Sequence, residues 1–263
     1  MLAELLFWPA LIAYAEAALA FATDARHPGR AGRLGTWGVR VGWLFQSALI
    51  AVQAVRADGF PWTSWAGSLH FFVWLVAAAY LVWGCKPRYR LLGLAVMPLV
   101  VAMLLAAWAG GGTGTHAPSG GSTAFLVLHV AFVLAAFAGF TMSAGLAGVY
   151  LWQERALKER RAGVLRLSAP SLMTLETLVT RTILFGLPCL TVGIVTGLIR
   201  LNRDGAGIDA LMVVTLVTWA VYATFLLLRF ERGWHGRRAA YLALAGFALV
   251  LVVRLALPIA HFS

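Results

Sequence analysis

The stretch STAFLVLHVAFVLAAFAGF, from Ser122 to Phe140, decides the fold of this chain. Apart from His129 it contains no ionisable side chain. Its length matches the roughly 20 apolar residues with which a helix crosses the hydrocarbon core of a bilayer. Ionisable groups at that depth are expensive and usually face a cavity or a partner. His129 therefore needs a structural or functional reason.

The whole chain has the composition of a polytopic membrane protein. Of its 263 residues 61% are apolar and only 12% are charged, whereas about a quarter of a soluble domain is charged. The net charge of +11 does not indicate a nucleic-acid partner, because the arginines lie in short loops and no separate basic domain exists. The two cysteines do not make a disulfide framework.

The sequence predicts an all-α fold with eight transmembrane helices, in a single domain that covers residues 1–263. Helices are expected because a lone strand cannot satisfy its backbone in lipid, and the alternating pattern of a membrane barrel is absent. The N-terminal run has no basic n-region, so it is interpreted as the first span and not as a signal peptide. The expected spans are Ala3–Thr23, Trp37–Val55, Trp65–Trp83, Leu91–Ala109, Thr123–Trp152, Leu178–Leu201, Ala210–Leu228 and Ala239–Ile259.

The basic residues predict the orientation. Fifteen arginines and lysines fall in the loops DARHPGRAGR, CKPRYR, ERALKERRAGVLRLSAPS and RFERGWHGRR, and three fall in the alternate loops. The positive-inside rule then places the first set in the cytoplasm and both termini outside. We expect a multi-pass protein of the bacterial inner or plasma membrane, with anionic lipids at its cytoplasmic face. Residues 171–176 are expected to form a capped or amphipathic helix entry at that face.

Three of the six histidines are expected in one outer layer of the membrane. At 1.5 Å per residue, His70 and His129 lie roughly 8–9 Å inside the outer boundary, and His261 lies at that boundary. A haem iron takes imidazoles as axial ligands, whereas zinc lacks a carboxylate or thiolate at this depth and a proton relay lacks acidic partners. From the residues alone, haem ligation and a hydrogen bond between helices both stay open.

Three more residues are candidates for the surroundings of such a site. Arg254 lies about two turns before His261. Its guanidinium matches a carboxylate such as a haem propionate, although snorkelling to the interface is the alternative. Trp62 and Trp65 lie at the outer interface, where they either anchor the chain or wall a ligand slot.

Four stretches of the chain carry a family resemblance: FLVLHVAFVLAAFAGF, SLMTLETLVTRTILFGLPCLTVGIVTGLI, TLVTWAVYATFLLLRFERGWHGRRAAYLALAGF and the terminal LPIAHFS. They resemble the cytochrome c assembly membrane-protein family, the CcsA/HemX-like haem-handling proteins, over residues 60–263. The resemblance implies that His129 and His261 are the two outward-side histidines that ligate haem iron. With the shared depth of the three histidines, it leads us to expect haem b as the cofactor and His70 as a third participant.

Two parts of the synthetase branch of that family are missing. RLNRDGAGIDA stands where the branch has a tryptophan-rich loop, and Leu227 stands where it has a histidine. The chain therefore resembles more closely the shorter HemX-type or YpjD-like branch. This implies a haem-handling protein that serves cytochrome c biogenesis or haem export, with a membrane protein of cytochrome c assembly as partner. The alternative is a HemX-type regulator of haem biosynthesis, which acts on the level of glutamyl-tRNA reductase.

Other classes of protein fit the sequence less well. A scaffold without haem would work through its basic inner face, at Arg155–Arg166 and Arg229–Arg238. A transporter is not indicated, because paired broken helices are not recognisable in two halves of the chain. Catalysis is the poorest fit, and no catalytic residue is predicted, because the sequence shows no nucleophile–base pair, paired carboxylates or phosphate loop.

Overall fold

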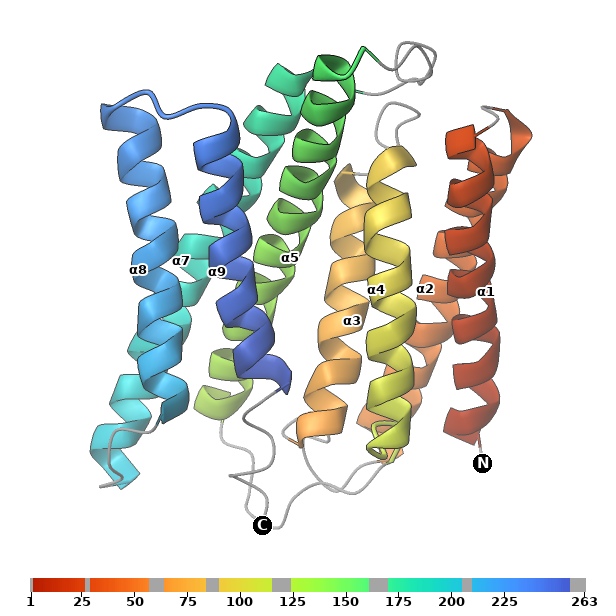
Figure 1. The fold of residues 1–263 in the computed structure, drawn as a ribbon. Helices are drawn as coiled ribbons and strands as arrows, with labels where there is room; N and C mark the ends of the chain where they lie inside the picture. Colours follow the sequence, from red (N-terminus) through yellow and green to blue (C-terminus); the bar gives the residue numbers. More distant parts are fainter. Residues whose placement is uncertain are drawn as a thin grey trace. The chain divides into compact units, whose positions relative to one another are not determined.

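A computed structural model describes residues 2–26, 29–56, 64–83, 90–114, 124–160, 170–204 and 210–255. These residues form eight helices (Figure 1), which are α1 (Leu2–Arg26), α2 (Arg30–Arg56), α3 (Trp65–Trp83), α4 (Arg90–Ala109), α5 (Ala124–Lys158), α7 (Leu172–Asp204), α8 (Ala210–Glu231) and α9 (Arg237–Leu255). The prediction of an all-α fold is confirmed for this part of the chain.

Seven of these helices are long and apolar enough to cross a membrane. Their spans are Ala3–Ala25, Arg30–Arg56, Trp65–Val82, Leu92–Ala109, Leu126–Lys158, Leu172–Ile199 and Met212–Glu231. The predicted eighth span, Ala239–Ile259, runs past the end of the described residues, and its described part forms α9. The chain is a multi-pass helical membrane protein. The orientation of its termini stays a prediction.

Several helices extend beyond the expected spans. Helix α2 begins seven residues earlier than predicted, at Arg30, because Asp24 accepts hydrogen bonds from the backbone amides of Gly29 and Gly32, both at 3.0 Å. A carboxylate at the start of a helix satisfies amides that have no partner within it. Helix α7 likewise begins at Leu172, so the predicted helix entry at residues 171–176 forms its first turns.

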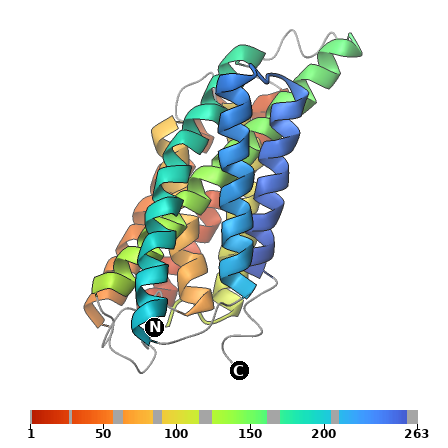
Figure 2. The same cartoon turned by 90° about the vertical axis from the view of Figure 1, so that its left-hand side faces the viewer.

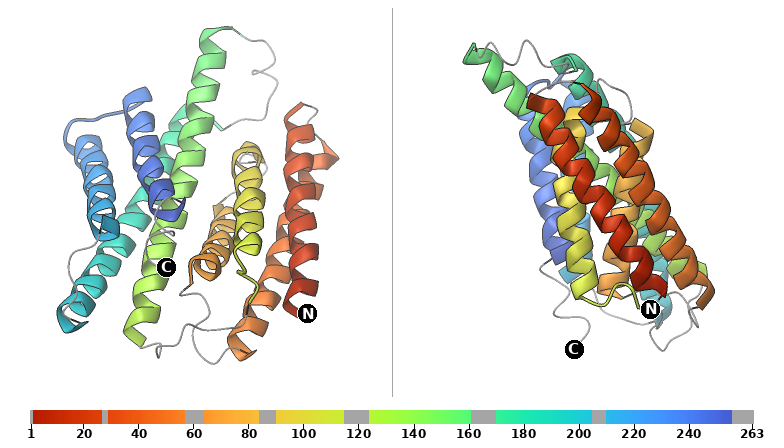
Figure 3. Two further views of the ribbon diagram at one scale, coloured as in Figure 1. Left: turned by 60° about the horizontal axis from the view of Figure 1, so that its bottom comes forward. Right: turned by 90° about the vertical axis from the view of Figure 1, so that its right-hand side faces the viewer.

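The helices group into two compact units, and each is described by itself. Unit 1 comprises Met1–Gly121 with Trp152–Leu172, and unit 2 comprises Ser122–Leu151 with Met173–Ser263. In unit 1, α1 packs against α2 and α4, and α3 packs against α4 and α2; Figure 3 shows α1 alongside α2 and α4. The predicted single domain stays a prediction.

Unit 1 is tied together by amide side chains on the buried face of α2. Gln46 accepts a hydrogen bond from the Tyr14 hydroxyl at 2.8 Å and donates one to the His70 carbonyl at 3.1 Å. Gln53 donates to the carbonyls of Gly112 and Gly114, both at 2.9 Å. These bonds join α2 to α1, α3 and the end of α4. Buried polar groups are costly unless they are paired in this way.

Unit 2 is built around the pairing of α5 with α7 and of α8 with α9. Helices α8 and α9 run side by side (Figure 2), and the Tyr222 hydroxyl on α8 donates to the Ala243 carbonyl on α9 at 3.2 Å. The Tyr222 ring also stacks on Phe140 of α5, with centroids 3.8 Å apart. Trp219 of α8 donates to the Thr191 hydroxyl of α7 at 2.9 Å. Ring stacking and side-chain hydrogen bonds therefore hold the four helices of this unit together.

Candidate functional site

The half-buried imidazole of His129 lies on α5 and faces α7 within unit 2. Its Nδ1 is 2.8 Å from the carbonyl oxygen of Gly193 and 3.3 Å from the hydroxyl oxygen of Thr196. The hydroxyl oxygen of Thr196 is 2.9 Å from the carbonyl oxygens of both Val192 and Gly193, to either of which it can donate. The ring is thus tied to the backbone of a neighbouring helix on one side.

Two glycines on α7, Gly193 and Gly197, leave the space that this ring occupies. A Cβ atom at Gly197 would lie 2.9 Å from Cε1 of His129, and a Cβ atom at Gly193 would lie 2.6 Å from Cγ2 of Val133. Distances below about 3 Å require something to shift, so α5 and α7 approach here only because two glycines face α5. Small residues allow this kind of close contact between membrane helices.

The hydrogen bond to Gly193 determines which ring nitrogen carries the proton. A carbonyl oxygen only accepts, so Nδ1 is the donor and, in the neutral imidazole, the lone pair lies on Nε2. Metal-ligating histidines are oriented in the same manner, with the other ring nitrogen donating to a backbone carbonyl. A hydrogen bond that only joins two helices has the same geometry, so the structural alternative for His129 stays open.

His70 lies on α3 in unit 1 and is fully buried. Its backbone carbonyl accepts from Gln46, but among the described residues neither nitrogen of its ring has a hydrogen-bond partner. A buried donor or acceptor without a partner is destabilising by about 1–3 kcal/mol. His129 belongs to the other unit, so the predicted common layer of these histidines stays a prediction.

The remaining predicted residues divide between the described and the undescribed parts of the chain. Trp65 opens α3, and a Cβ atom at Gly110 would lie 2.6 Å from Cζ3 of its ring, so the indole packs on the end of α4. Arg254 lies in α9, but its side chain is outside the described part. Trp62 and His261 also lie outside the described residues.

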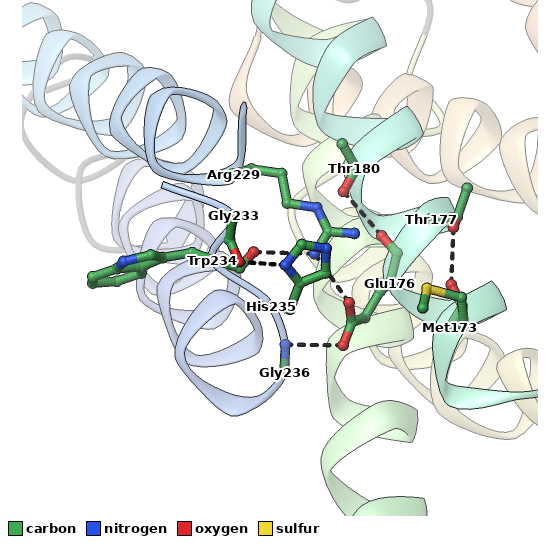
Figure 4. Close-up of polar contacts among 9 residues, drawn as sticks. All are labelled: Met173, Glu176, Thr177, Thr180, Arg229, Gly233, Trp234, His235 and Gly236. Atoms are coloured by element: carbon green, nitrogen blue, oxygen red, sulfur yellow. Dashed lines mark hydrogen bonds and ion pairs between the residues drawn. The ribbon is translucent and has the colours of Figure 1, made fainter. Parts of the chain in front are cut away.

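A second polar centre, which the sequence did not predict as a unit, joins the beginning of α7 to the turn between α8 and α9. Figure 4 shows Glu176 facing Arg229 and the backbone of Gly236. The carboxylate accepts from the Arg229 guanidinium at 3.0 Å and from the Gly236 amide at 2.9 Å. Arg229 also donates to the Trp234 carbonyl at 3.1 Å.

This ion pair is well shielded, with side chains only 12% and 13% exposed. Gly236 has a φ of +76°, a conformation that favours glycine. The signal in the sequence for this ion pair is a pair of opposite charges at the ends of two successive apolar runs, Glu176 before one and Arg229 after the next. From the sequence alone, Arg229 counts among the arginines of the basic loops. Together the contacts hold the α8–α9 turn against α7.

Metal chemistry can be tested against the donors present. In the part of the chain that the structure describes, no group of three or more histidine, cysteine, aspartate or glutamate side chains is placed to hold a metal ion. A haem iron needs fewer protein ligands, because two axial imidazoles suffice. His129, with its lone pair on Nε2, fits one of those positions. Of the predicted ligands, it is the one for which the described structure provides an oriented ring.

The spanning helices and the oriented histidine define the class, a multi-pass membrane protein with a candidate axial imidazole. The sequence model of the cytochrome C assembly protein family matches residues 62–260. The chain therefore belongs to the cytochrome c assembly protein family, as the resemblance predicted. The matched segment includes five of the six predicted site residues, and His261 follows it directly.

Curated relatives extend this similarity over most of the chain. It is 29% identical to the cytochrome c biogenesis protein CcsA of Gloeothece citriformis, over 83% of this chain and 82% of the relative. It is 28% identical to CcsA of Microcystis aeruginosa over the same shares. The CcsA protein of Guillardia theta is 26% identical over 78% of this chain and 75% of its own length. The HemX-type branch, with glutamyl-tRNA reductase as a partner, stays a prediction.

Proposed function

We propose that this protein handles haem during cytochrome c biogenesis and binds it between His129 and His261. The observation that carries the proposal is the hydrogen bond from Nδ1 of His129 to the Gly193 carbonyl, at 2.8 Å. It leaves the lone pair on Nε2, the nitrogen that would face an iron atom. Family membership supports the biological role, since relatives along most of the chain are named cytochrome c biogenesis proteins.

Each predicted residue has a separate task in this proposal. His129 and His261 would hold haem b through their imidazoles, and its iron would accept both as ligands. Arg254 pairs with a propionate in a two-pronged contact. From the sequence, Trp62 and Trp65 remain the expected walls of a ligand slot. His70, buried with no described partner for its ring nitrogens, remains a third participant on the sequence prediction alone.

The direction of delivery follows from the charge distribution along the sequence. Basic loops on alternate sides of the spans favour a cytoplasmic position for those loops. Both termini, and with them His261, then face outward across the bacterial inner membrane. A haem held on that side is available to a partner of cytochrome c assembly, either for cytochrome c biogenesis or for export.

Haem binding is tested on the full chain, purified in mild detergent and titrated with haem. We expect an absorption spectrum of six-coordinate, bis-imidazole haem in the parent protein. His129→Ala is expected to lose one axial ligand and to shift the spectrum toward a five-coordinate form. His261→Ala should do the same, and added free imidazole should restore the six-coordinate spectrum in both variants.

His235→Ala is the matched control, because His235 is an exposed histidine in the α8–α9 turn of the same unit. It should leave the haem spectrum unchanged. If His129→Ala keeps the parent spectrum and instead lowers only the thermal stability, the hydrogen bond to Gly193 is purely structural. The proposed bis-histidine site would then be wrong.

A further inference from the structure

Helix α2 presents a basic face that the haem proposal does not use. We call the exposed residues Arg30, Arg33, Trp37 and Arg40 the α2 basic face. Their spacing of three, four and three residues places them within about 80° of one another around a helix with 3.6 residues per turn. The opposite side of α2 is buried, and Gly35 and Gly42 bring it close to Phe21 and Tyr14 of α1.

The same face continues as an apolar stripe toward the other end of α2. It runs through Leu44, Ala48, Ala51 and Val55, which are all exposed. Leu44 is 61% exposed and Val55 is 85% exposed. One surface of the helix therefore has cations with a tryptophan at one end and hydrocarbon along the rest. A phospholipid has the complementary arrangement, with a phosphate followed by acyl chains.

The length of α2 indicates where the change from basic to apolar lies in the membrane. Its 27 residues extend for about 40 Å, against a hydrocarbon core of about 30 Å. If the other end reaches the opposite interface at Arg56, then roughly the first seven residues lie among the headgroups. Trp37 then stands at the boundary, where tryptophan is enriched, and Arg40 begins just inside it.

Arg40 turns back toward that boundary. Its guanidinium carbon lies 5.0 Å from the centre of the Trp37 ring, one turn nearer the start of the helix. A cation over an aromatic face is held by the ring quadrupole, and long basic side chains extend to the interface in this way. Trp37 thus draws the Arg40 guanidinium toward headgroup level, in the direction of the helix end that carries Arg33.

No carboxylate of the described residues forms an ion pair with Arg30, Arg33 or Arg40. Two acids of α1 lie at the level of this face: Asp24 is buried and its oxygen accepts the amides of Gly29 and Gly32, and Glu16 is exposed. The face therefore carries net positive charge at headgroup level. Guanidinium groups bind phosphate oxygens in two-pronged fashion, and basic clusters at this level attract anionic lipids.

We propose that the α2 basic face is a binding site for one anionic phospholipid. Arg33 and Arg40 hold its phosphate, Arg30 adds charge at the headgroup, and the acyl chains lie along Leu44–Val55. An acidic peptide would fit the arginines but not the long apolar stripe that continues from them. The inference does not rest on the haem proposal, because no residue of the α2 basic face is among the proposed haem contacts.

Binding is measured on the full chain in detergent, by energy transfer from its tryptophans to a dansyl-tailed phosphatidylglycerol. Phosphatidylcholine with the same tails is the uncharged reference. We expect the parent to bind phosphatidylglycerol more tightly, and Arg33→Gln/Arg40→Gln to weaken that binding roughly 30-fold. Arg33→Lys/Arg40→Lys keeps the charge and should lose much less. High salt should weaken the binding of phosphatidylglycerol but not that of phosphatidylcholine.

The matched control is Arg232→Gln/Arg238→Gln, which removes two exposed arginines, one from the α8–α9 turn and one from the first turn of α9. One of them, Arg238, also lies over a tryptophan ring, 5.8 Å from the centre of Trp234. The control should keep the parent affinity. An equal loss in both double variants would overturn the proposal, because only net charge would then matter. Equal affinity of the parent for the two lipids, or competition by millimolar inorganic phosphate, would also overturn it.

Discussion

The imidazole of His129 is hydrogen-bonded to the backbone of Gly193, with Nδ1 2.8 Å from the carbonyl oxygen. The contact joins α5 to α7 across 64 residues of sequence. A backbone carbonyl cannot be removed by mutation, so this orientation of the ring is robust to most substitutions on α7. It is sensitive to added volume at the two glycines that face α5.

Gly197→Ala should displace the His129 ring. The new Cβ atom would lie 2.9 Å from Cε1 of His129, and overpacking of this kind costs about 1–3 kcal/mol. We expect haem affinity to fall by about tenfold or more, as measured by titration of the purified protein. Gly148→Ala on α5 is the control, since a Cβ atom there meets no atom within 4 Å. Equal affinities in the two variants would contradict the proposed role of His129.

Thr196→Val should have a smaller effect in the same direction. The substitution removes the hydroxyl oxygen that lies 3.3 Å from Nδ1 of His129 but keeps the carbonyl of Gly193. One hydrogen bond is worth about 1 kcal/mol, so haem affinity should fall about fivefold. Thr177→Val, at a half-buried position about five turns earlier on the same helix, should leave the titration unchanged. A loss larger than that of Gly197→Ala would mean that Thr196, and not Gly193, orients the ring.

Glu176→Gln should destabilise unit 2. The neutral amide leaves Arg229, whose side chain is 12% exposed, without its charged partner, and hydrogen bonds to charged groups contribute about 1.5–3 kcal/mol. The unfolding transition in detergent should move to lower temperature. Glu159→Gln is the control, because its partner Arg155 is 77% exposed, and such surface pairs contribute about 0–1 kcal/mol. Similar shifts in both variants would show that shielding of the Glu176 pair has no energetic effect.

Tyr14→Phe should loosen the packing of α1 on α2. It removes the hydroxyl that donates to Gln46 at 2.8 Å and leaves a buried amide oxygen without that donor. A loss of about 1–3 kcal/mol is expected, measured as a lower unfolding temperature. Tyr241→Phe, at a position that is 59% exposed, is the matched control and should change little. An unchanged transition in Tyr14→Phe would show that Gln46 finds another donor.

The composition and the apolar runs were sufficient to predict the helices, because a segment in lipid has few ways to satisfy its backbone. The helix boundaries were less predictable. The early start of α2 depends on Asp24, whose carboxylate accepts the amides of Gly29 and Gly32. Hydropathy locates the part of a helix that meets hydrocarbon, whereas capping decides where the helix begins.

The sequence by itself determined that His129 is unusual, because an imidazole in an apolar run is costly wherever it lies. It could not identify Gly193 as the partner, because a backbone carbonyl leaves no mark in the sequence and the two residues meet only when α5 packs on α7. The pair of Glu176 and Arg229, 53 residues apart, depended on the tertiary structure for the same reason. The free-energy cost of burying a polar side chain follows from its residue type. Its hydrogen-bond or ion-pair partner depends on which helices pack against each other.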